Sequence, residues 1–156
     1  MPRNVSAAAR AYHKNWGIIM AGGLNNEGDC CSNNVTYTSS GEDFYDLTPV
    51  PEDGKYHCAA AINSSHLFVT GLGPIDNKSF MYSKWSNQWE RLQDMPTGRR
   101  YGGCGVVRSA NGSISVAVVG GLDITGEHRL NTVEIYSVEE NSWTRSDIPY
   151  FSSVNF

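Results

Sequence analysis

The 156-residue sequence predicts an all-β chain made of three consecutive four-stranded antiparallel sheets. First, a short apolar run that ends in glycine occurs three times, and its first glycine falls at Gly22, Gly71 and Gly120, two intervals of 49 residues. Second, each run is followed by a tyrosine and, seven residues later, by a second aromatic residue. Third, the chain holds 16 glycines, which is typical of many short strands joined by turns. No stretch has the periodicity of an amphipathic helix, so helices are not expected.

The apolar runs are expected to form the second strand of each repeat unit. They span residues 18–23, 67–72 and 116–121, and each is long enough for one buried strand. Glycine at the end of the run lets the chain turn where a Cβ atom would clash. The first and third runs end in paired glycines, whereas the second ends in Gly71-Leu72-Gly73.

The aromatic pairs are expected to lie on the two arms of a hairpin formed by the third and fourth strands. In each pair a tyrosine comes seven residues before a second aromatic, with turn-forming residues between them. The pairs are Tyr37 with Phe44, Tyr82 with Trp89, and Tyr136 with Trp143. The corresponding third strands are expected at 35–38, 80–83 and 133–137.

The first strand of each unit is expected in segments dominated by small residues, at 5–9, 58–62 and 103–107. A proline follows the second aromatic of each unit, at Pro51, Pro96 and Pro149. We therefore treat the chain as a single repeat region divided at about 3–51, 52–96 and 97–149. Residues 150–156 would begin a further unit.

Together these markers resemble the kelch repeat, in which paired glycines, a tyrosine and a tryptophan recur in this order about every 50 residues. The resemblance implies that each unit is one blade of a β-propeller, with small residues at the inner edge and the aromatics between blades. The first unit departs from the pattern by having Phe44 in place of tryptophan. The repeat markers are Gly22, Gly23, Tyr37 and Phe44, then Gly71, Tyr82 and Trp89, then Gly120, Gly121, Tyr136 and Trp143.

Three blades are fewer than the roughly four to eight with which propellers usually close. An open stack would leave aromatic-rich faces and sheet edges exposed. Three explanations are compatible with the sequence, and we prefer the first. The chain is a piece of a longer kelch protein, or two copies form a homodimer that completes a six-blade ring, or the chain is an open half-propeller that docks on something else.

Composition argues against several classes of partner. A net charge of −4 disfavours a phosphate-binding face, so no nucleic acid is expected. No stretch approaches the roughly 20 apolar residues that a membrane span requires. The compartment stays open, with a cytoplasmic location preferred and an extracellular one possible. The extracellular alternative rests on five Asn-x-Ser/Thr sequons, which are acceptor sites for N-glycosylation. They lie at Asn4, Asn34, Asn63, Asn77 and Asn111.

The cysteines and histidines show no spacing typical of a metal site, so no metal or cofactor is expected. Cys30 and Cys31 are adjacent, while Cys58 and Cys104 stand alone and are expected to be small buried residues. His57 is expected in the core or the channel of the propeller.

Catalytic motifs are missing too, so we predict no catalytic residues. No Gly-x-Ser-x-Gly occurs, and the glycine-rich segment 102–105 opens a strand rather than a helix, unlike a phosphate-binding loop. Two alternatives to a scaffold remain: an enzyme-type kelch propeller whose active site is completed by missing blades, and an extracellular adhesion or carbohydrate-binding module.

We predict a non-catalytic kelch scaffold that binds a protein or peptide through loops at the blade ends. In kelch-type substrate adaptors, arginines and aromatics at the start of the first strand contact an acidic peptide, and arginine can grip a carboxylate by two bonds. An alternative is that these arginines pair with carboxylates of neighbouring loops. The matching positions are Arg3, Arg99, Arg100 and Tyr101, and the loop at 24–33 adds Asn25 and Asn26.

Overall fold

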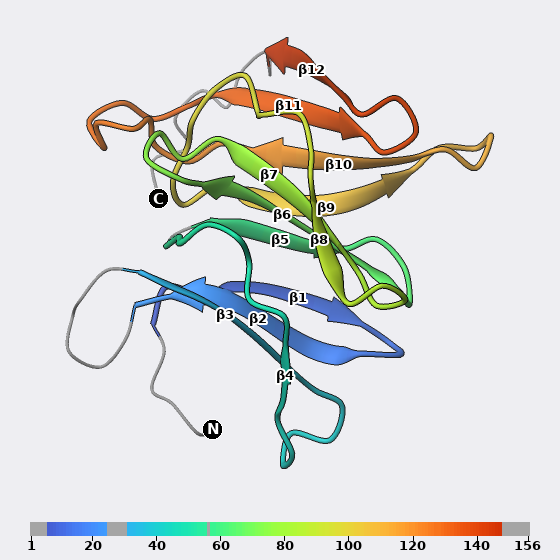
Figure 1. Cartoon of the computed structure of the whole chain (residues 1–156). Coiled ribbons are helices and arrows are strands. Elements are labelled where there is room, and N and C mark those ends of the chain that lie inside the picture. The colour runs from blue at the N-terminus through green and yellow to red at the C-terminus, as the bar shows by residue number, and fades with distance from the viewer. Residues whose placement is uncertain (1–5, 25–30, 56, 148–156) are drawn as a thin grey trace, which may run out of the picture.

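The computed structural model describes residues 6–24, 31–55 and 57–147. These residues form three four-stranded antiparallel sheets, and no helix occurs among them. Figure 1 shows the sheets stacked one above another in chain order, from blue to red. The predicted all-β fold of propeller-like blades is confirmed.

Each sheet is a simple meander in which every strand pairs with the next one along the chain. Blade 1 contains β1 (Ala9–His13), β2 (Gly17–Gly23), β3 (Ser32–Thr38) and β4 (Tyr45–Leu47). Blade 2 contains β5 (Cys58–Ala61), β6 (His66–Leu72), β7 (Lys78–Ser83) and β8 (Gln88–Arg91). Blade 3 contains β9 (Gly103–Arg108), β10 (Ile114–Val119), β11 (Thr132–Ser137) and β12 (Ser142–Asp147).

The first strand of blade 1 differs from its prediction at 5–9. It begins at Ala9, which pairs with Ala21 of β2, and ends with His13 opposite Gly17. The apolar pattern of β2 does not fix where its partner strand begins. The small and polar residues before Ala9 are compatible with either a strand or a loop. The other first strands start at the predicted residues.

The aromatic marker of blade 1 also differs from its prediction. Tyr45, not Phe44, lies opposite Tyr37 in the ladder, and their stacked rings are 5.3 Å apart. Phe44 lies in the turn before β4. The turn of this hairpin is one residue longer than in the other blades, so a spacing counted from sequence selects the wrong aromatic.

Neighbouring blades pack face to face, and residues alternate between the two interfaces of the middle blade. In β6, Val69 lies in the core shared with blade 1, whereas the preceding Phe68 lies in the core shared with blade 3. This alternation is the two-residue period of a strand buried on both sides. The innermost strands β1, β5 and β9 contact one another in succession.

The tryptophans on the fourth strands tie each blade to the one before it. Trp89 Nε1 donates to the carbonyl of Thr48 (2.8 Å), and Trp143 Nε1 donates to that of Gln93 (2.9 Å). Trp16, which is not a repeat marker, is fully buried against Tyr37 and donates to a carbonyl in blade 2. The expectation that aromatics fill the space between blades therefore agrees with these contacts.

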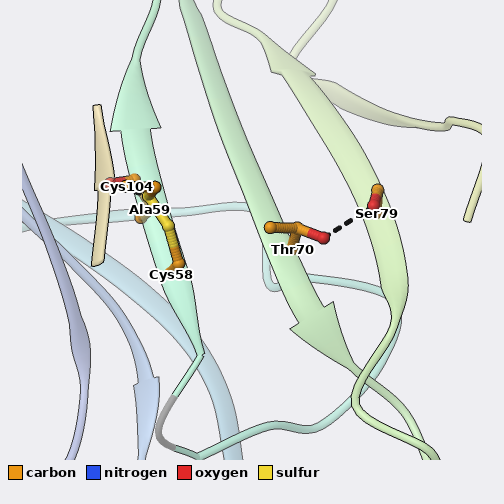
Figure 2. Close-up of a disulfide and its surroundings, with 5 residues drawn as sticks. All are labelled: Cys58, Ala59, Thr70, Ser79 and Cys104. Atoms are coloured by element: carbon orange, nitrogen blue, oxygen red, sulfur yellow. Dashed lines mark hydrogen bonds between the residues drawn. A yellow bond between two sulfur atoms is a disulfide. The ribbon is translucent and has the colours of Figure 1, made fainter. Parts of the chain in front are cut away.

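Cys58 and Cys104 form a disulfide between β5 and β9, which corrects the expectation that they are separate buried thiols. Figure 2 shows this bridge beside Ala59, with the Thr70–Ser79 hydrogen bond (2.7 Å) on the neighbouring strands of blade 2. The two positions differ by one in repeat register, because Cys58 pairs with the residue just before Gly71 and Cys104 with the second residue before Gly120. Since successive side chains point to opposite faces of a strand, this offset turns the two cysteines toward each other.

Candidate partner-binding surface

One end of the blade stack gathers the longer connections. Because antiparallel strands alternate in direction, the loops after the second strands and those leading into the first strands lie at the same end. Segments 73–77, 97–102 and 122–130 form a surface that we call the loop face. It combines one loop of blade 2, the link between blades 2 and 3, and one loop of blade 3.

Backbone hydrogen bonds join these three segments. The Arg99 amide donates to the carbonyl of Asp76 (3.0 Å). Arg100 and Leu122 exchange two hydrogen bonds, of 2.9 and 2.8 Å. Gly121 permits this close approach, because a Cβ there would clash with the carbonyl of Arg100. The loop face is therefore one cross-tied body rather than three independent loops.

Arg99 is buried within blade 3. Its guanidinium lies 3.0 Å from the Glu134 carboxylate, and the side chains are only 2% and 0% exposed. It also donates to the carbonyls of Gly120 (2.9 Å) and Thr132 (3.2 Å). Arg99 thus fastens the loop face to the body of the blade.

Arg100 pairs with a carboxylate from the neighbouring blade. Its Nε atom donates to Asp76, which lies in the loop after β6 and is largely buried. Arg99 and Arg100, two of the three arginines predicted from sequence, therefore have carboxylate partners. Asp76 lies in a neighbouring loop, as in the alternative stated above, whereas Glu134 lies on β11. About two thirds of the Arg100 side chain is shielded, since it is 33% exposed.

Tyr101 is exposed (57%) and has a left-handed backbone, with φ of +59°. For a residue with a Cβ atom this conformation costs on the order of 1 kcal/mol, and such strain often marks functional positions. The hydrogen bonds of the preceding Arg100 hold the segment in this conformation.

Two isoleucines that sequence reasoning missed lie on the loop face. Ile75 is 51% exposed and Ile124 is 46% exposed. A Cβ atom at Gly98 would clash with the Ile75 carbonyl and lie 2.9 Å from Cγ2 of Ile124, so both residues flank this glycine. The available signal was a large apolar residue within each of two otherwise polar loops.

The turn that carries Ile124 is ordered by its own side chains. Asp123 accepts hydrogen bonds from the Thr125 hydroxyl (2.7 Å), the Gly126 amide (2.9 Å) and the His128 ring (2.9 Å). These bonds, that from Thr125 above all, hold the pKa of Asp123 below its usual range. The turn thus needs no partner to keep Ile124 facing outward.

His57 lies behind the loop face, where it lines a small hollow together with Arg99. Among the described residues, neither of its ring nitrogens has a hydrogen-bond partner. Burial lowers the pKa of His57 to about 4. The described residues contain no group of three or more His, Cys, Asp or Glu side chains placed to hold a metal ion.

The remaining predicted contact residues, Arg3, Asn25 and Asn26, lie outside the described residues. The described part of the chain also contains no helix long and apolar enough to cross a membrane.

No protein-family model matches the chain. Its sequence is similar to Kelch-like protein 40b of Danio rerio, with 27% identity over 130 residues that cover 76% of this chain. The chain spans 20% of the length of that protein. This similarity and the three antiparallel sheets fit kelch-type blades.

Proposed function

We propose that this chain is a non-catalytic kelch scaffold that binds a protein or peptide through its loop face. The observation that carries the proposal is the combination of exposed Ile75, Tyr101 and Ile124 on a cross-tied backbone. Rigid loops that present apolar and aromatic groups suit recognition, because little ordering entropy is lost on binding.

In this proposal Arg100 and Tyr101 contact the partner directly, and Arg99 holds the segment in place. Arg3, Asn25 and Asn26 remain proposed contact residues on the basis of the sequence alone. The absence of catalysis is proposed because the sequence lacks nucleophile and phosphate-loop motifs. The similarity to a kelch-like protein supports a protein-interaction module.

The test compares two exposed aromatic positions at opposite ends of the blades. Tyr101→Ala alters the loop face, whereas Trp85→Ala alters the turn between β7 and β8, where Trp85 is 84% exposed. Affinity purification from source cells with quantitative mass spectrometry should identify partners that Tyr101→Ala loses and Trp85→Ala keeps. Partners lost equally with both variants, or only with Trp85→Ala, would contradict the proposed surface.

We also propose that the outer blade faces accept a second copy of this chain, completing a six-blade ring. The outer face of blade 1 carries exposed Ile18, and that of blade 3 carries exposed Val107 and Val119. Val119, just before Gly120, matches Thr70 before Gly71, which faces the next blade within the chain. The outer face of blade 3 is thus built like a face that already packs on a blade.

Light scattering during size-exclusion chromatography tests this second proposal. A single species with twice the monomer mass, which Ile18→Asp converts to monomer, would support the ring. A monomeric or polydisperse sample would count against it.

A further inference from the structure

The loop face is close to electrically neutral. Its three segments contain three arginines and three carboxylates. Arg99 is neutralised by Glu134 and Arg100 by Asp76, so two of the arginines expected to attract an acidic peptide already have counter-charges. An acidic partner would have to compete with these carboxylates for the same guanidinium groups.

Ile75 and Ile124 lie on the two sides of a blade boundary and both border Gly98. Ile75 comes from blade 2 and Ile124 from blade 3, and a Cβ atom at Gly98 would meet the Ile75 carbonyl and Cγ2 of Ile124. Because glycine has no side chain, Gly98 itself adds no bulk beside these two residues. Both are about half exposed, so an apolar group that settles over Gly98 could remove water from both side chains.

The backbone beneath the two isoleucines is held on both sides. The Asp76 amide donates to the Gly73 carbonyl (3.2 Å), and the Asp76 carbonyl accepts from Arg99. On the other side, Asp123 closes the turn around Ile124. Because this backbone is already held in place, little conformational entropy is lost when a partner binds. Such a surface suits a short segment with a single anchor residue.

From these observations we infer that the loop face binds an uncharged apolar segment of a partner protein, anchored by an aliphatic or aromatic side chain over Gly98 between Ile75 and Ile124. This inference rests on the proposed function and names the chemistry of the partner. It replaces the acidic peptide suggested by the resemblance with a segment whose recognition depends on apolar contact.

The experiment selects binders from a phage-displayed library of random linear peptides on the immobilised chain. Synthetic copies of enriched peptides are then titrated by fluorescence polarisation against wild type, Ile75→Asp, Ile124→Asp and Arg100→Ala. Trp85→Asp is the matched control, because Trp85 is 84% exposed and lies in the turn between β7 and β8, at the opposite end of the blades. Circular dichroism checks that each variant folds.

The expected result is enrichment of peptides with no net charge and with Leu, Ile, Phe or Trp as the shared residue. Either loop-face isoleucine variant should weaken their binding at least about tenfold, and Trp85→Asp less than about twofold. Acidic peptides that depend on Arg100 and tolerate Ile75→Asp would overturn this inference but leave the proposed function standing. If no enriched peptide responds to any loop-face variant, both are overturned.

Discussion

Reduction of the Cys58–Cys104 disulfide should destabilise the chain strongly. The bridge closes a loop with a sequence separation of 46 residues. In the chain-entropy model, a cross-link that closes a loop of this size lowers the conformational entropy of the unfolded chain. This raises the free energy of unfolding by about 4 kcal/mol. The bridge also joins β5 to β9 at the inner edge, so its loss should loosen the contact between blades 2 and 3.

The assay is urea unfolding followed by tryptophan fluorescence, with and without reductant. We expect the free energy of unfolding to fall by about 4 kcal/mol on reduction. The Cys58→Ala/Cys104→Ala double variant should show a similar loss and respond little to reductant, which separates this bridge from the other cysteines. Cysteine alkylation without reduction, read by mass spectrometry, establishes whether the bridge is present. Equal unfolding midpoints in the oxidised and reduced wild-type protein would refute the reasoning.

Three further predictions follow from buried or shared groups. Because burial lowers the pKa of His57 from 6.5 to about 4, only the unfolded chain takes up this proton between those values. The free energy of unfolding should therefore be highest above pH 6.5 and fall by up to about 3 kcal/mol on acidification to pH 4; His57→Gln should flatten this dependence in urea titrations, and an unchanged slope would contradict it. Glu134→Ala leaves the Arg99 charge buried without its partner and should cost about 3–5 kcal/mol in chemical denaturation, with a smaller loss when Arg99→Met is added. Trp143→Phe removes a hydrogen bond to blade 2 and should cost about 1 kcal/mol, whereas exposed Trp85→Phe should change stability by less than about 0.5 kcal/mol in the same assay.

The repeat and its strands could be predicted because their signals are local. The apolar run of β6 and the glycine near its end are properties of one short segment, whatever packs against it. The prediction of Phe44 as the second aromatic marker of blade 1 was wrong for an equally local reason. A turn longer by one residue shifts the partner of Tyr37 from Phe44 to Tyr45, and turn length is poorly encoded in composition.

The candidate site was only partly predictable. The resemblance to kelch repeats drew attention to Arg100 and Tyr101, which lie on the loop face. It could not reveal that Asp76, in a different blade, neutralises Arg100, or that Ile75 and Ile124 both border Gly98. These relations depend on three loops that are separated in sequence and meet only when the blades stack.

The sequence alone determined the strand-rich fold, its division into three four-stranded sheets and the aromatic hairpins of blades 2 and 3, because each follows from short-range periodicity and turn chemistry. Only the tertiary structure decided which side chains meet, including the Cys58–Cys104 bridge and the Arg99–Glu134 pair. The physical reason is that hydrophobic patterning sets which face of a strand is buried, whereas the identity of a neighbour depends on how whole blades pack.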